Sequence, residues 1–304
     1  MSEPFHLLIA DAAPLPDPPP LPALTALLAR LRPAGSVAAD DACPATPLEL
    51  ALARAHGLPG APGRVPWAAF ETGTVGTPCA WLTPCHWQLG LDHARLLDPA
   101  ELALTESESR ALLAAAAPLL AEDGVTLTYA RPDAWLAQGE LLRDLSTWSL
   151  SRALARPLTP DLLPQAPTPA HGARLRRLQA EVQMLLHAHP VNQADTRPWP
   201  VNALWIAGAG ALDAPLPPNP RVHVERRLSP LPPEADAAQR RAAWQAIDAG
   251  SLTQLRRVLA GGGDARLTLC GPRRAVSCAS ARGLGAALSN LLKPLRLQNL
   301  LSQL

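Results

Sequence analysis

Hydrophobic positions along this chain fall into short apolar runs and longer amphipathic stretches. The first run covers residues 5–10 and is followed closely by prolines, which predicts a buried strand that leaves its sheet into a loop. In residues 22–32 the leucines recur at the spacing of one helix face, which predicts a helix packed on that strand. A strand and a helix this early favour an α/β fold.

Two capping boxes predict where further helices begin. Thr46 and Glu49 flank a proline at the first helical position, and Gly57 ends that helix. Thr105 and Glu108 repeat the arrangement and open a longer helix. Other helices are predicted over residues 147–155, 173–189, 233–249 and 252–259, with a helical tail from residue 286.

Short apolar or alternating segments predict the remaining strands. The clearest alternation covers residues 125–129, directly after a glycine. Strands are also predicted over residues 79–84, 87–90, 201–206, 221–225 and 266–269. Because strands and helices alternate over most of the chain, we expect a mostly parallel central sheet covered by helices.

Length and composition allow a sizeable core. The 304 residues are 48% hydrophobic and 17% charged, so we expect one α/β domain over residues 1–304. Prolines crowd residues 157–172, which predicts either a linker or a long surface loop there.

Charge and targeting signals narrow the functional classes. Lys and Arg number 27 and Asp and Glu 26, so the chain lacks the cationic surplus expected of a nucleic-acid or anionic-membrane binder. The first apolar run is too short for a signal peptide, and no run reaches the length of a membrane span. We therefore expect a cytoplasmic protein whose five scattered cysteines are reduced thiols.

The segment from residue 174 to residue 210 holds most of the candidate chemistry. It is predicted to form a helix, a tight turn, a strand and a glycine loop at the carboxyl end of that strand, where open α/β sheets bind ligands. Its amides could bind a substrate oxygen, and its glycines let backbone amides approach an anion. Alternatively, these residues only cap the helix and turn the chain. The ligand-binding candidates are His189, Asn192, Asn202, Trp205, Gly208 and Gly210.

Two further residues are candidates for catalysis. Asp11 follows the first strand, and His86 follows a predicted strand between Cys85 and Trp87. His86 could serve as a metal ligand or general base, or it could be a partly buried histidine bonded to a backbone carbonyl. A Cys85 nucleophile with His86 as its base is disfavoured, because adjacent strand residues point to opposite faces.

Several of these motifs resemble a known family. The run His189-Pro190-Val191-Asn192, then Asn202, Trp205 and Gly208-Ala209-Gly210, resembles a segment of archaeal-type cofactor-independent phosphoglycerate mutases. The boxes at residues 82–87 and 178–186 resemble a bacterial group labelled phosphoglycerate mutase or Rpf-type regulatory protein.

The resemblance implies an alkaline-phosphatase-like core, whose chemistry uses two divalent metals and a transiently phosphorylated Ser or Thr. Asp11 takes the position of a metal ligand, but Ala12 follows it where the superfamily usually has glycine. Residues 261–280 contain Asp264 and no histidine, so the late Asp-His ligand cluster is missing. Asp92-His93 is the one Asp-His dipeptide and lies early in the chain. The resemblance thus implies a reduced core with a degenerate metal site.

We therefore expect a phosphoglycerate-mutase-like protein that needs no cofactor and binds a small phosphorylated metabolite or a protein partner, in a regulatory role. The alternative is an active phosphomutase or phosphatase that uses Mn or Zn, with ligands drawn from Asp11, His86, Asp92, His93 and His189. A third hypothesis is a structural subunit whose helix at residues 288–304 packs on a partner. The sequence leaves the oligomeric state open.

Overall fold

The computed structural model describes residues 4–12, 18–90, 94–154, 156–193, 199–229, 237–280, 295 and 297–304. Its contacts gather in two compact units, whereas the sequence favoured one domain over residues 1–304. Unit 1 comprises Met1–Ala42, Thr46–Gly57 and Asn219–Leu304, and unit 2 comprises Cys43–Ala45 and Leu58–Pro218. Most of unit 2 is thus an insertion in the sequence of unit 1.

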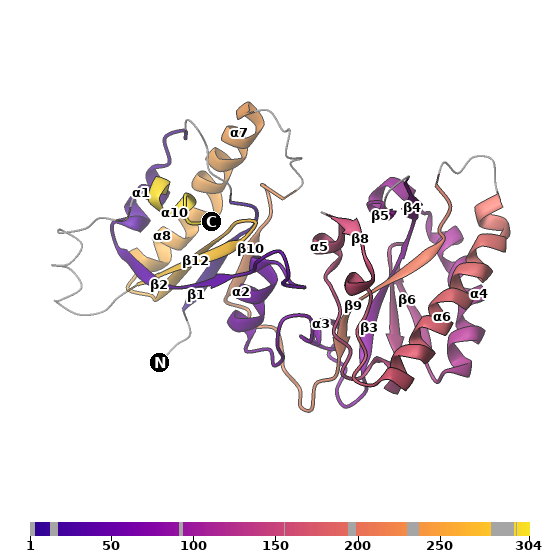
Figure 1. Cartoon of the computed structure of the whole chain (residues 1–304). Helices are drawn as coiled ribbons and strands as arrows, with labels where there is room; N and C mark the ends of the chain where they lie inside the picture. The colour runs from indigo at the N-terminus through magenta and orange to yellow at the C-terminus, as the bar shows by residue number, and fades with distance from the viewer. Residues whose placement is uncertain are drawn as a thin grey trace. The chain divides into compact units, whose positions relative to one another are not determined.

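Unit 1 is built on a five-stranded sheet in the order β10-β1-β11-β12-β2 (Figure 1). The strands are β1 (Phe5–Ile9), β2 (Leu31–Ala38), β10 (Val222–Glu225), β11 (Ala265–Cys270) and β12 (Arg274–Ser280). Strand β1 pairs in parallel with β10 and β11, whereas β12 runs antiparallel to β11 and β2. The three parallel strands therefore end at one edge of the sheet.

Helices pack on both faces of this sheet. One core contains Leu7 and Ile9 together with residues of α1, α8 and the π-helical turn η5, and the other contains Leu8 and residues of α2. This division follows from the alternation of side chains along β1. The helical elements are α1 (Pro22–Leu28), α2 (Pro47–His56), α7 (Ala237–Ile247), η5 (Asp248–Leu252), α8 (Thr253–Ala260) and α10 (Leu297–Leu301).

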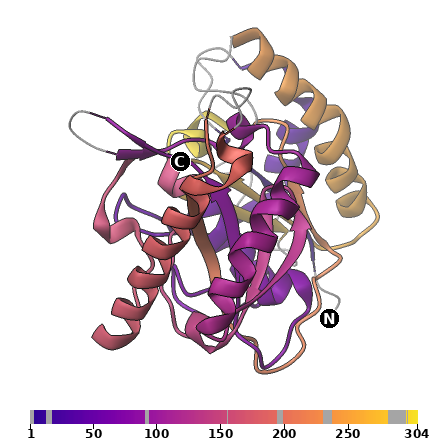
Figure 2. The same ribbon diagram turned by 90° about the vertical axis from the view of Figure 1, so that its right-hand side faces the viewer.

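Unit 2 contains a four-stranded antiparallel sheet, β6-β7-β3-β9, and a small three-stranded sheet, β4-β5-β8. The strands are β3 (Cys79–Cys85), β4 (Trp87–Leu89), β5 (Ala94–Leu96), β6 (Thr126–Arg131), β7 (Ala134–Gln138), β8 (Pro157–Leu158) and β9 (Ala203–Gly210). Helices α4 and α6 lie side by side against the larger sheet (Figure 2). The α-helices are α3 (Trp67–Thr72), α4 (Glu106–Glu122), α5 (Leu150–Leu154) and α6 (Pro169–Ala188). The 3-10 turns are η1 (Pro99–Leu102), η2 (Glu140–Leu142), η3 (Pro160–Leu162) and η4 (Pro190–Gln193).

Both capping boxes form as the sequence predicts. Thr46 accepts a hydrogen bond from the Glu49 amide at 3.2 Å, and the Glu49 carboxylate accepts one from the Thr46 amide at 2.7 Å. Gly57 then ends α2 in the left-handed conformation. Thr105 and Glu108 make the equivalent pair of bonds at the start of α4. These boundaries are set by side chains a few residues away, so local sequence is sufficient to predict them.

The α/β class is confirmed, and among the strands that the structure describes parallel pairing joins β1 with β10 and β11. The strands that the sequence did not predict are β2, β5, β7, β8 and β12, and each of them pairs antiparallel. β7 returns from β6 through the two residues Pro132 and Asp133, a connection too short for the crossover that parallel strands need. β2 begins at Leu31, within the residues predicted as helix, and contains Pro33 and Gly35, which are rare in strands.

The proline-rich residues 157–172 lie within unit 2 and do not connect the two units. They contain β8, η3 and the first residues of α6, and Gln165 forms a bridge with Ser146. Most of the predicted helical tail lies outside the described residues, apart from α10. Among the helices that the structure describes, none combines the length and the apolar character that a bilayer span requires.

Candidate functional site

The carboxyl edge of the parallel strands in unit 1 presents Asp11 directly after β1. The backbone of Asp11 has a φ of 52°, a left-handed conformation that costs an L-residue about 1–2 kcal/mol. The Ser229 hydroxyl donates a hydrogen bond to Asp11 Oδ2 at 2.7 Å. Open α/β sheets bind ligands at this edge, so the pair of Asp11 and Ser229 is the candidate site of unit 1.

A second carboxylate, Glu225, ends β10 at the same edge and is buried. It accepts a hydrogen bond from the Arg227 amide at 3.1 Å and pairs with the Arg227 guanidinium at 3.3 Å. The Ser251 hydroxyl also donates to it. Unit 1 therefore satisfies this carboxylate with its own donors.

The described side chains around Asp11 fit a pair of divalent cations poorly. Burial, and then the negative charge of Asp11, raises the pKa of Cys270 to about 12, so this thiol keeps its proton at neutral pH. In the described ranges no three side chains among His, Cys, Asp and Glu gather closely enough to hold a metal ion. Two-metal phosphoryl transfer depends on such clusters. The metal candidates Asp92 and His93 lie outside the described residues.

His86 lies in unit 2, whereas Asp11 lies in unit 1. Its side chain is buried, its Nδ1 donates to the Pro200 carbonyl at 2.8 Å, and its ring packs against Trp199 with centroids 5.3 Å apart. This is the histidine bonded to a backbone carbonyl that the sequence offered as one interpretation. Burial also raises the pKa of the neighbouring Cys85, which disfavours a thiolate nucleophile there.

Asn192 fastens the end of α6 to the chain that enters β9. Its Nδ2 donates to the carbonyls of Leu186 and Val201, each at 2.7 Å, and its Oδ1 accepts from the Val201 amide at 2.8 Å. His189 makes a local turn, with its Nδ1 accepting from the Val191 amide at 3.2 Å. The side-chain amide of Asn192 thus forms hydrogen bonds with three backbone groups.

Asn202 and Trp205 make backbone contacts of the same kind. The Asn202 amide accepts from the backbone N–H of Trp87 at 2.8 Å and donates to its carbonyl at 3.1 Å. The indole of Trp205 is 1% exposed and donates to the Trp148 carbonyl at 3.1 Å. Both residues join β9 to neighbouring segments of unit 2.

Gly208 and Gly210 belong to β9 itself, although the sequence placed them in a loop after the strand. Gly208 has a φ of 63°, and a Cβ there would lie 2.9 Å from the Cβ of Trp67. A Cβ at Gly210 would lie 3.0 Å from the Cβ of Pro66. The glycines therefore allow β9 to pass close to the start of α3. Ligand binding by the six residues from His189 to Gly210 stays a prediction.

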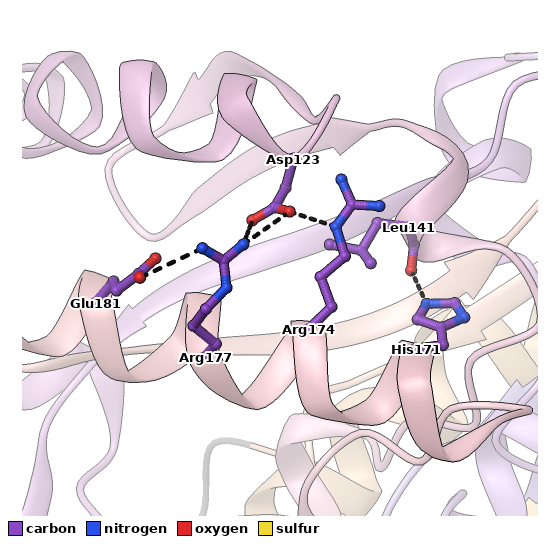
Figure 3. Close-up of polar contacts among 6 residues, drawn as sticks. All are labelled: Asp123, Leu141, His171, Arg174, Arg177 and Glu181. Atoms are coloured by element: carbon purple, nitrogen blue, oxygen red, sulfur yellow. Dashed lines mark hydrogen bonds and ion pairs between the residues drawn. The ribbon is translucent and has the colours of Figure 1, made fainter.

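Asp123, which no sequence pattern singled out, is a buried carboxylate that follows α4 (Figure 3). Only 4% of its side chain is exposed, and it pairs with Arg177 at 2.9 Å and with Arg174. Nearby, His171 donates to the Leu141 carbonyl at 2.7 Å, and Arg177 also pairs with Glu181 (Figure 3). Arg174 and Arg177 thus hold α6 to the end of α4. The sequence gives no local signal for this pairing, because the partners are 51 and 54 residues apart.

Comparisons with known proteins add little to this description. No family model matches the chain, and no curated protein matches it. Among solved structures, the chain is similar to a cofactor-independent phosphoglycerate mutase from Thermoplasma acidophilum DSM 1728, at 14% sequence identity and a TM-score of 0.37. The match covers 99% of this chain and 98% of that one. A TM-score this low does not establish a common fold.

Proposed function

We propose that this chain is a phosphoglycerate-mutase-like protein that binds a small phosphorylated metabolite or a protein partner and does not transfer phosphoryl groups. The resemblance of residues 82–87 and 174–210 to that family supports the first half of the proposal. The surroundings of Asp11 support the second half. Asp11 accepts a hydrogen bond from a serine hydroxyl and interacts electrostatically with the protonated thiol of Cys270, and Glu225 is satisfied by arginine and serine.

The single observation that carries the proposal is the hydrogen bond from Ser229 to Asp11, with no cluster of acidic or imidazole ligands among the described residues. A phosphoryl group in transfer carries charge on several oxygens, and two-metal sites neutralise that charge with cations held by several carboxylates and histidines. One carboxylate and one hydroxyl supply too few donors for two cations.

The test measures metal content and turnover on the full chain. We expect less than one equivalent of bound Mn or Zn, and no turnover of 3-phosphoglycerate or p-nitrophenyl phosphate above that of an Asp11→Ala variant. Two equivalents of metal, together with turnover that Asp11→Ala abolishes, would overturn the proposal. Calorimetric titration with 3-phosphoglycerate then measures binding without turnover.

A second candidate function is favoured by the same pair of residues. A serine hydroxyl 2.7 Å from a carboxylate, at the ligand-binding edge of a sheet, is the arrangement of a nucleophile beside an acidic group. An active phosphomutase or phosphatase would then use Ser229 as the residue that is transiently phosphorylated. The test is whether labelled phosphate becomes covalently trapped on the protein. Trapping on wild type and on the control variant Ser251→Ala, but not on Ser229→Ala, would favour this function over the first.

A further inference from the structure

Helix α6 has two polar edges that differ in how their side chains are satisfied. One edge faces α4, and its arginines pair with Asp123 (Figure 3). The other, which we call the open edge, consists of Gly172, Arg176, Gln179 and Gln183, which lie on one side of the helix at intervals of four, three and four residues. In the part of the chain that the structure describes, the side chains of Arg176, Gln179 and Gln183 have no hydrogen bond or ion pair.

Two adjoining hollows meet at the open edge. The first, the α6 groove, has a volume of about 420 Å³ and lies between the open edge and the proline-rich loop at residues 160–169. The second, the slot, has a volume of about 30 Å³ and lies beneath α6, where Trp87, Leu204 and Ile206 line it. Gln179 lines both hollows, so they adjoin at this side chain. The groove is within the range of about 300–1,000 Å³ that is common for small-molecule sites.

The chemistry of the two hollows selects one class of ligand. Arg176 is the one charged side chain among the described residues that line either hollow, so the ligand it complements is an anion. The planar guanidinium binds a carboxylate through two parallel hydrogen bonds. Apart from Gln179 and Gln183, the slot is lined by apolar side chains and the indole of Trp87, so the part of the ligand that enters it is apolar.

We propose that the α6 groove binds a short amphipathic carboxylate, with its carboxylate on Arg176 and its alkyl end directed past Gln179 into the slot. The small volume of the slot limits the alkyl end to a few carbons. This proposal goes beyond the function proposed above, because its site contains neither Asp11 nor Ser229, although Trp87 and residues 176–183 lie in segments that resemble the mutase family. The two can therefore fail independently.

The test uses hexanoate and the full chain labelled with 5-fluorotryptophan. Trp87 lines the slot, so its ¹⁹F resonance, assigned with a Trp87→Phe variant, reports on occupancy. We expect hexanoate to shift this resonance saturably, and acetate and hexan-1-ol to bind at least tenfold more weakly because each lacks one of the two recognised parts. Hexyl phosphate separates the two anionic head groups. Tenfold tighter binding of hexyl phosphate than of hexanoate would overturn the assignment of a carboxylate.

Variants separate recognition from a general effect of charge. Arg176→Gln should weaken hexanoate binding at least tenfold, whereas Arg110→Gln, which removes another exposed positive charge, on α4, should not change it. Arg176 is exposed and unpaired in the described chain, so Arg176→Gln should keep the thermal unfolding midpoint of wild type. Asp11→Ala should bind hexanoate normally. An unmoved Trp87 resonance, or equal affinity in wild type and Arg176→Gln, would refute the proposal.

Discussion

Unit 1 contains a buried histidine that makes its stability depend on pH. His6 is on β1, is 7% exposed, and lies 2.8 Å from the Thr268 hydroxyl through its Nε2. Burial, then the positive charge of Arg266 and the nearby His56, lowers the pKa of His6 from 6.5 to about 4. The unfolded chain therefore binds a proton that the folded chain does not, throughout this pH interval.

The size of the effect follows from the shift. Each pH unit between the two pKa values changes the free energy of unfolding by about 1.36 kcal/mol. When the pH falls from above 6.5 to about 4, His6 therefore lowers the free energy of unfolding of unit 1 by about 3 kcal/mol. The stability is complete above pH 6.5 and is lost as the solution becomes more acidic. Burial also lowers the pKa of His56, which adds a change of the same sign.

The assay is urea unfolding of the fluorotryptophan-labelled chain between pH 7.5 and pH 4.5. The sequence of unit 1 contains a single tryptophan, Trp244, which is 1% exposed, so its ¹⁹F resonance follows unit 1 separately from unit 2. His6→Gln should reduce the slope of stability against pH by about one proton, and His56→Gln should reduce it less. If His6→Gln leaves the slope of wild type unchanged, the assignment to His6 is wrong.

Three further substitutions test contacts between distant parts of the chain. Asp248→Ala should destabilise unit 1 by about 1–3 kcal/mol in urea, because this buried carboxylate caps α1 by accepting hydrogen bonds from the amides of Ala23 at 3.1 Å and Leu24 at 2.8 Å. An unfolding transition at Trp244 that matches wild type would contradict this role. Asp123→Ala should lower the unfolding free energy of unit 2 by about 1–3 kcal/mol, because it removes the shared partner of two arginines; equal stability of wild type and variant would show that the pairing is not stabilising. Asn192→Ala should destabilise unit 2 by about 1–3 kcal/mol in the same assay, because it leaves three backbone groups without their amide partner; a variant of normal stability would instead favour the ligand-binding role.

The elements that local sequence predicts well share a short-range cause. Thr46 and Glu49 are three residues apart, and both halves of their capping box form. The sequence predicts a helix over residues 173–189, and α6 ends at Ala188, because the residue before Pro190 is restricted away from the helical conformation. By contrast, β12 offers a run of small and polar residues whose strand character depends on pairing with β11 and β2.

The residues of the candidate site also differ in whether local sequence predicts their contacts. The position of Asp11 after the first strand followed from sequence, and so did the alternative in which His86 bonds a backbone carbonyl. The hydrogen bond from Ser229 to Asp11 joins residues 218 positions apart. The two edges of α6 can be told apart only in the folded chain, where one of them pairs with Asp123. The partners of such contacts lie too far apart along the chain for a local sequence pattern to reveal them.

The sequence by itself determined the α/β class, both ends of α2, the start of α4 and the strand that leads to Asp11, because these depend on side chains within a few residues of one another. Tertiary structure decided the division into two units and the antiparallel strands. It also decided which carboxylates are satisfied, as with Asp248, which caps a helix 225 residues away at the Ala23 amide. The physical reason is that desolvation and pairing energies depend on which groups the folded chain brings together, and separation along the chain does not encode that proximity.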